Sequence, residues 1–216
     1  MCGRFINLTR INSIKKIFNI NSSLNNNLLS FNIAPSQTCH IVFKKNELNI
    51  DVAKWGYIFN DSKTNQEKNA INSRLETLTD KILFKESYYK RKCIIPLNGY
   101  YEWSIIDNEK IPFFIHLPPA EPMYLAGIWK YNDYKINNNK VFTVITKKAN
   151  KHIEEIHHRM PIVLSQYEAE EYLYDDNSSL LTNGFTSSLD SELDFFPVSK
   201  LVNNPFNNSK ECIKPI

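Results

Sequence analysis

Short runs of β-branched and aromatic residues, separated by polar turns, dominate the middle of the chain. Five of them follow one another at 93–96, 99–103, 113–117, 124–129 and 141–145. Their length and composition are typical of β-strands. The same pattern predicts strands at 39–43 and up to Trp55-Gly56-Tyr57, a turn between them at Lys45-Asn46, and a last strand at 195–202.

Apolar residues at helical spacing occur only in short stretches. Thr9 is expected to cap a helix over 10–19, and Asn150 a helix that carries Ile153, Ile156 and His157. Ser165 and Glu168 form a capping-box signature before a helix over 166–174. A further helical stretch is expected after Asn72, and polar residues 60–69 are expected to form an exposed loop.

Strands therefore dominate, and the helices are interspersed without a βαβ rhythm. The sequence predicts the α+β class, as one domain over residues 1–216. Its β core is expected to be mostly antiparallel, twisted and barrel-like, with short helices between the strands. A chain of this length can bury a sizeable core without disulfide or metal staples.

Composition indicates which compartment and which kinds of site to expect. The chain has 216 residues and is 42% hydrophobic, and no apolar run approaches membrane length. No secretion signal opens it. Its four cysteines, none in a CxxC pair, are expected to be reduced thiols in a cytosol-like compartment. We expect no metal, because the clustered spacing of a zinc site is missing. We also expect no cofactor, and no membrane contact because no apolar run is long enough.

Charge is distributed unevenly along the chain. Residues 1–159 hold 23 lysines and arginines against 14 acidic residues, whereas residues 160–216 hold 3 against 9. A basic body with an acidic C-terminal part suits a polyanion that meets one face. A solvated surface with uneven charge explains the same numbers, so charge alone does not decide.

The opening residues Met1-Cys2-Gly3-Arg4-Phe5 offer unusual chemistry. If Met1 is cleaved, Cys2 carries an α-amine and a thiol on adjacent carbons. The amine can condense with an aldehyde to an imine, and the thiol can then close a five-membered thiazolidine. Both groups titrate near neutrality, with reference pKa values of about 7.7–8.0 and about 8.5. The alternative is that Cys2 is only a small residue behind the initiator methionine.

Three other polar groups could take part in chemistry. Glu102, walled by aromatic residues, would have a raised pKa as a general acid or base requires, unless its carboxylate faces solvent. His157, just before Arg159 and a proline, could shuttle protons beside a phosphate or simply interact with a helix end. Asn72 and Arg74 offer an amide to orient a nucleophile and a guanidinium suited to phosphate.

Taken together and in order, these motifs resemble one family, the SOS response-associated peptidase (SRAP) family. The resemblance spans the whole chain and is specific as a set. Its motifs are Met-Cys-Gly-Arg-Phe at the start, Asn-Ile-Ala-Pro-Ser-Gln, Trp-Gly-Tyr, Asn72 to Thr77, Gly99 to Trp103, Ala126 to Trp129, Ile156 to Pro161, Pro197 to Ser199 and Val202 to Asn204.

The resemblance implies an enzyme that shields abasic sites in single-stranded DNA during the DNA damage response. Processed Cys2 would form a thiazolidine crosslink with the open-ring sugar, and Asn72 would hold its amine. Glu102 would move protons, and His157 would assist ring opening. Contacts to the DNA would come from Arg4, Pro35, Arg74 and Arg159.

The resemblance also implies a monomer whose partner is single-stranded DNA. It would be cytoplasmic and nucleoid-associated if the source is bacterial, and nuclear if it is eukaryotic. Two alternatives stay open: an N-terminal-nucleophile thiol peptidase that includes removal of its own Met1, and a non-covalent single-strand-binding module.

One departure from the family pattern concerns the DNA wedge. Family members commonly carry one or two tryptophans between the Trp-Gly-Tyr and Asn-x-Arg motifs, and one of them inserts into the DNA. Here Phe59 is the only aromatic residue in 58–71. Because base stacking is worth about 1–3 kcal/mol per base, we expect either weaker DNA binding or a wedge made by Phe59. The Asn-Ser-Arg-Leu-Glu motif also departs at two positions from the usual Asn-Ala-Arg-Ser-Glu but keeps Asn72 and Arg74.

Overall fold

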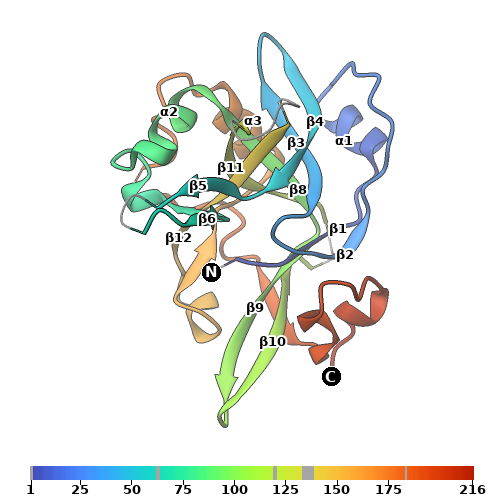
Figure 1. Ribbon diagram of the computed structural model, residues 1–216. Helices are drawn as coiled ribbons and strands as arrows, with labels where there is room; N and C mark the ends of the chain where they lie inside the picture. The colour runs from blue at the N-terminus through green and yellow to red at the C-terminus, as the bar shows by residue number, and fades with distance from the viewer. Residues whose placement is uncertain (1, 62–63, 119–120, 133–138, 183) are drawn as a thin grey trace.

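Two sheets form the centre of the molecule in a computed structural model, which describes residues 2–61, 64–118, 121–132, 139–182 and 184–216 (Figure 1). The first has five strands in the order β15-β10-β9-β1-β2, all paired antiparallel. Their bounds are β1 Phe5–Asn7, β2 Ser30–Ile33, β9 Gly99–Ile106, β10 Glu109–His116 and β15 Asp194–Pro197.

The second sheet has eight strands, and five of them form a ring of pairings. The ring runs from β12 through β4, β3, β8 and β11 back to β12, with β7, β13 and β14 attached to it. Among the described strands of this sheet, the pairs of β12 with β4 and with β7 are parallel and the others are antiparallel. The bounds are β3 Thr38–Lys44, β4 Leu48–Trp55, β7 Asn72–Arg74, β8 Lys92–Leu97, β11 Met123–Tyr131, β12 Lys140–Lys148, β13 Arg159–Pro161 and β14 Val163–Leu164.

The predicted α+β class with a mostly antiparallel core is therefore confirmed, although the ring is not a regular barrel. A third, two-stranded sheet pairs β5 (Tyr57–Asn60) with β6 (Glu67–Ala70). This hairpin occupies part of the segment that was expected to be an exposed loop. Its polar composition hid the strands because every residue of β6 is exposed or only half-buried.

The helices are short, and two of them begin at other residues than the sequence predicted. Helix α1 (Ile11–Ile17) begins after Arg10, and Thr9 does not cap it. The Ile11 backbone N–H instead donates to Asn27 Oδ1 at 3.0 Å, so a residue beyond the helix supplies the cap. After Asn72 the chain continues β7 and a 3₁₀ turn, η1 (Leu75–Thr77), and only then helix α2 (Ile82–Lys90).

The C-terminal elements agree better with the prediction. Helix α3 (Gln166–Tyr174) has the capping box of Ser165 and Glu168. Asn150 Oδ1 accepts from the Ile153 backbone N–H at 2.8 Å and starts a 3₁₀ turn rather than an α-helix. The remaining 3₁₀ turns are η2 Ile153–Glu155, η3 Lys200–Asn203 and η4 Lys210–Ile213.

The hydrophobic core brings the start of the chain into the middle of the molecule. Cys2 is fully buried and belongs to the same cluster as Trp55, Tyr100, Phe142 and Met160. Strand β1 reaches that cluster between β2 and β9, at the point where the β9–β10 hairpin leaves the body (Figure 1). Burial of apolar surface thus fixes the position of a residue that sits at a chain end.

Candidate active site

The pairing of β1 with β9 places Cys2 next to Glu102. Phe5 lies opposite Tyr100, and the Tyr101 backbone N–H donates to the Arg4 carbonyl at 2.9 Å. Side chains alternate along a strand, so Tyr100 and Glu102 share one face of β9. Tyr100 packs in the same core cluster as Cys2, which identifies this face as the one turned toward the thiol.

Asn72 holds the backbone of Cys2 from another strand. Its Nδ2 donates to the Cys2 carbonyl at 2.8 Å. Strand β7 sets this position by pairing in parallel with β12, where Asn72 lies opposite Val144. The Oδ1 of Asn72 is buried and accepts no hydrogen bond from the described residues. Asn72 therefore fixes the position of Cys2 through Nδ2, while its Oδ1 remains able to accept a further hydrogen bond.

The carboxyl of Glu102 is suited to proton transfer. Its side chain is buried, and this burial raises its pKa above the ordinary value. Burial also raises the pKa of the Cys2 thiol, and the charge of Glu102 raises it further. The thiol is therefore protonated in the resting site and needs a base before it can attack. Glu102 is the charged side chain that acts most strongly on it.

His157 follows the η2 turn and is neutral in the fold. Burial lowers its pKa, since the protonated ring would lose hydration. Its Nδ1 lies 3.0 Å from the Arg159 backbone N and 3.1 Å from the Arg159 carbonyl O, and its ring stacks on His158 at 4.3 Å. Strand β13 after it pairs with β12, which also carries β7, so His157 and Asn72 are joined through one shared strand.

The three arginines expected to bind phosphate differ in their surroundings. Arg4 donates to Asn32 Oδ1 at 2.7 Å and to the Val202 carbonyl at 2.5 Å. Arg159 is buried and forms a two-point ion pair with Glu76, at 2.6 and 3.0 Å. It also donates to the Thr146 carbonyl at 2.8 Å.

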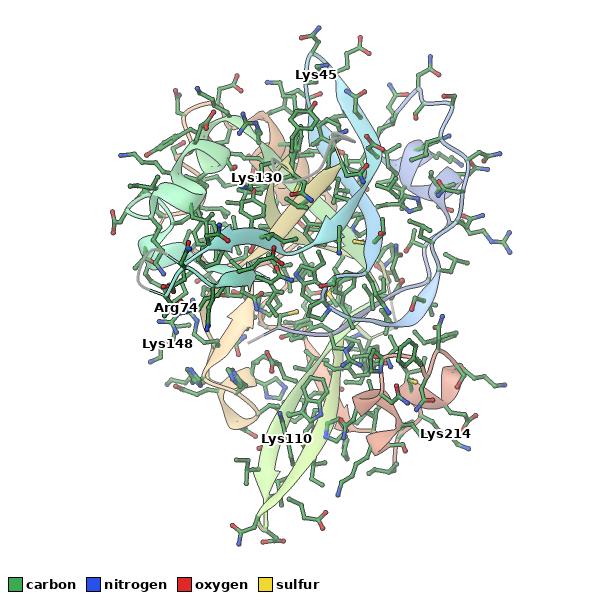
Figure 2. All side chains as sticks on the ribbon, viewed as in Figure 1. Lys45, Arg74, Lys110, Lys130, Lys148 and Lys214 are labelled. Carbon is green, nitrogen blue, oxygen red and sulfur yellow. The ribbon has the colours of Figure 1, made fainter. Side chains whose placement is uncertain are left out.

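Arg74, by contrast, is exposed. It lies opposite Thr146 on β12, near Lys148, and both cations extend from the same edge in Figure 2. Pro35 is half-buried in the turn between β2 and β3. Phe59 is half-buried in β5, opposite Lys68. That these residues and the three arginines bind DNA stays a prediction.

Comparison with known proteins gives the family. A profile described as SOS response associated peptidase (SRAP) matches residues 1–205. The chain belongs to the SRAP family. It is 34% identical over 224 residues to the abasic site processing protein YoqW of Bacillus subtilis, covering 99% of each chain. It is 27% identical to the abasic site processing protein YedK of Escherichia coli, covering 86% of this chain and 84% of that one.

Solved structures agree on the fold. A crystal structure of a protein from Bacteroides thetaiotaomicron superimposes on this SRAP chain with a TM-score of 0.78, at 21% identity and with full coverage of both chains. Within the described part of this chain, no cluster of three or more His, Cys, Asp or Glu side chains could hold a metal ion. None of the helices described is long and apolar enough to cross a membrane.

Sequence reasoning missed two groups of this SRAP site. Glu76 lies in the quoted Asn72–Thr77 motif, but a carboxylate was not expected to bind Arg159. Tyr100 was quoted only as part of a motif, although its spacing of two residues from Glu102 on a predicted strand already placed both side chains on one face. Glu76 matters because it contacts Arg159, and Tyr100 because it lies near Cys2. Both of these neighbours are distant in the sequence, so the contacts are known only from the fold.

Proposed function

We propose that this SRAP protein forms a covalent crosslink to abasic sites in single-stranded DNA through Cys2, after removal of Met1. The relatives named as abasic site processing proteins support the substrate class. The observation that carries the proposal is the contact of Asn72 with the Cys2 carbonyl beside buried Glu102, with Asn72 Oδ1 unpaired among the residues that the structure describes. Once Cys2 is the first residue, that free oxygen can accept a hydrogen bond from its α-amine.

The reaction begins at the amine. Held by Asn72, the neutral amine of Cys2 attacks the aldehyde carbon of the opened sugar. Glu102, protonated more readily because of its burial, gives a proton to the hydroxyl that leaves as water. His157, neutral in the fold, assists opening of the closed sugar ring: it accepts the proton of the C1′ hydroxyl and passes it to the ring oxygen as the bond from C1′ to the ring oxygen breaks. The product of these steps is an iminium ion.

Ring closure follows. The Glu102 carboxylate, having lost its proton, takes the thiol proton of Cys2, and sulfur attacks the iminium carbon. The electron pair of the C=N double bond moves to nitrogen, which becomes a neutral ring amine. Thiol and amine on adjacent carbons give this step a high effective molarity, up to about 10⁵–10⁸ M in well-oriented cases. The thiazolidine therefore outlasts a simple imine.

DNA would approach along the edge that carries Arg74. The exposed Arg74 and Lys148 lie near the β7–β12 pair that positions Asn72. Arg4 and Arg159 would contribute to the positive potential from their internal positions, and Phe59 on the β5–β6 hairpin would stack on a base. A peptidase reaction is favoured by the family description alone.

The test compares the wild-type protein with Cys2 variants on abasic single-stranded DNA in a denaturing gel. Wild-type protein should give a heat-stable adduct without reductant, and mass spectrometry should show a chain that begins at Cys2. Cys2→Ser should leave at most an imine that borohydride must trap. Cys39→Ala is the matched control, since Cys39 is equally buried in the same cluster. A stable, unreduced adduct from protein that retains Met1 would rule the mechanism out.

A further inference from the structure

Two neighbouring tyrosines on β9 have opposite hydrogen-bonding states. Tyr101 points to the face away from Cys2, packs with Phe114, and donates its hydroxyl to the Phe31 carbonyl at 2.8 Å. Tyr100 points to the Cys2 face and is fully buried. Its hydroxyl has no hydrogen-bond partner among the described residues.

A buried hydroxyl without a partner is unusual. Folding removes its hydrogen bonds to water, and the great majority of buried polar side-chain atoms regain a partner. Phenylalanine would fill the same space at this position without that loss. Such a group therefore suggests a partner that is present at another stage of the protein's work.

The surroundings of Tyr100 indicate which partner that is. Its hydroxyl lies within electrostatic reach of the Cys2 thiol, of Glu102 and of Asp190, and burial together with these groups raises its pKa well above the ordinary value. Asp190 keeps its own place in the resting fold: its Oδ2 forms an ion pair with Lys147 and accepts from the Ser187 backbone N–H at 3.0 Å, and its Oδ1, though buried without a hydrogen-bond partner among the described residues, is not bonded to the Tyr100 hydroxyl. Glu102 and the Cys2 sulfur both change charge during the proposed reaction. The sulfur belongs to the same buried cluster as the Tyr100 ring, and it is the atom that becomes negative and then forms the new bond.

We propose that Tyr100 is a positioning residue that donates a hydrogen bond to the Cys2 sulfur during ring closure, an inference that rests on the proposed function. The S–H bond breaks, and its proton passes to the Glu102 carboxylate. The S–C bond forms while the C=N electron pair moves to nitrogen. Between these events the sulfur is negative at a buried position, where a hydroxyl donor stabilises it most.

Tyr100→Phe removes the hydroxyl and keeps the ring, and Tyr101→Phe on the adjacent residue is the matched control. We expect the borohydride-trapped imine of Tyr100→Phe to form at the wild-type rate. The stable, unreduced adduct should form about tenfold to hundredfold more slowly, as expected for one lost hydrogen bond to a charged group. Tyr101→Phe should keep both rates and show a lower melting temperature.

A second readout needs no DNA. Alkylation of Cys2 by iodoacetamide at one fixed alkaline pH is followed by mass spectrometry of the N-terminal peptide. Burial raises the pKa of this thiol, so the rate reports the small thiolate fraction, and loss of a donor to the thiolate should slow alkylation in Tyr100→Phe about tenfold to hundredfold. Tyr101→Phe should match the wild type.

The two readouts keep the two proposals separate. Absence of any adduct from the wild type would refute the proposed function, while the alkylation rate would still report on Tyr100. An unchanged alkylation rate in Tyr100→Phe would overturn the inference. So would an unchanged ratio of imine to stable adduct, or an equal change in both tyrosine variants.

Discussion

Polar side chains on the two faces of β9 differ in whether they form hydrogen bonds within the protein. On one face, four side chains bind the C-terminal segment 199–213 or the strands beside it. We call this set, Arg4, Asn32, Tyr101 and Trp103, the C-terminal clasp. Asn32 Nδ2 donates to the carbonyls of Val202, Asn204 and Asn207, and Trp103 Nε1 donates to Asn203 Oδ1 at 2.8 Å. On the other face, the Tyr100 hydroxyl and Asn72 Oδ1 are buried without a partner among the described residues.

This contrast separates stability from function within one strand. Hydrogen bonds within the protein hold the clasp together, and among its described polar side-chain atoms Arg4 Nε is the buried one that lacks a partner. Unpaired polar groups destabilise the resting pocket, which is acceptable only if a substrate or a reacting atom pairs with them. Changes on the Cys2 face should therefore affect chemistry more than stability, and changes in the clasp should do the reverse.

The largest effect is expected from Glu102→Gln. This variant keeps the shape of the side chain but cannot exchange a proton, so stable adduct should form about a hundredfold or more slowly. Its stability should move the opposite way. Because the pKa of Glu102 is raised in the fold, wild-type protein loses stability as pH rises through that folded value. The variant does not undergo this loss in the free energy of unfolding, which amounts to about 1.4 kcal/mol per unit of pKa shift.

Rates on abasic DNA and thermal unfolding at pH 4 and pH 8 measure both effects. The gain in melting temperature should be present at pH 8 and vanish below the unfolded pKa. Glu109→Gln on the paired strand is the control, since this exposed carboxylate contacts only the surface cation Lys200 in the ion pairs described. Wild-type rates from Glu102→Gln would make Glu102 a structural residue.

Asn32→Ala should break the clasp. Asn32 is buried, accepts from Arg4, and donates to three carbonyls of the C-terminal segment. Leaving these groups unpaired should lower the free energy of unfolding by about 3 kcal/mol, at about 1–3 kcal/mol for each unsatisfied group. Urea unfolding measures this, with exposed Asn46→Ala as the control. If instead the adduct rate per folded molecule fell at unchanged stability, the division between the two faces would be wrong.

The sequence was sufficient for the parts of the fold that local patterns encode. The strands between 93 and 145 and the capping box of α3 were predicted because alternation and capping act over a few residues. The cap of α1 by Asn27 and the β5–β6 hairpin were not, because a distant partner or an all-polar strand leaves no local signal. The parallel pairing of β7 with β12 likewise depends on residues 72 apart, as between Asn72 and Val144.

The site shows the same division. Cys2, Asn72 and Glu102 were named from residue chemistry and from the family resemblance, and the fold brings them together. The ion pair of Arg159 with Glu76 could not be foreseen, because it joins residues that are 83 positions apart. The sequence motif alone does not tell whether the guanidinium of an arginine is exposed to solvent or paired inside the protein.

The smallest effects, and the finest test of the comparison, concern Arg74 and Arg159. Exposed Arg74 forms no ion pair with the part of the chain that the structure describes, so Arg74→Ala should flatten the logarithmic salt slope of DNA binding by about 0.7 and leave unfolding unchanged. Arg159→Ala should weaken binding as well, but it also frees Glu76 and the Thr146 carbonyl and should lower the melting temperature. Arg159→Lys keeps the charge and loses the two-point geometry, so it should retain the slope while still reducing stability. Binding titrations at several salt concentrations, paired with thermal unfolding, separate the two arginines. Two results would contradict this prediction: an affinity of the wild type that does not depend on salt, or a loss of stability in Arg74→Ala alone. Either would show that internal ion pairing does not determine which arginine supports stability and which supports DNA binding.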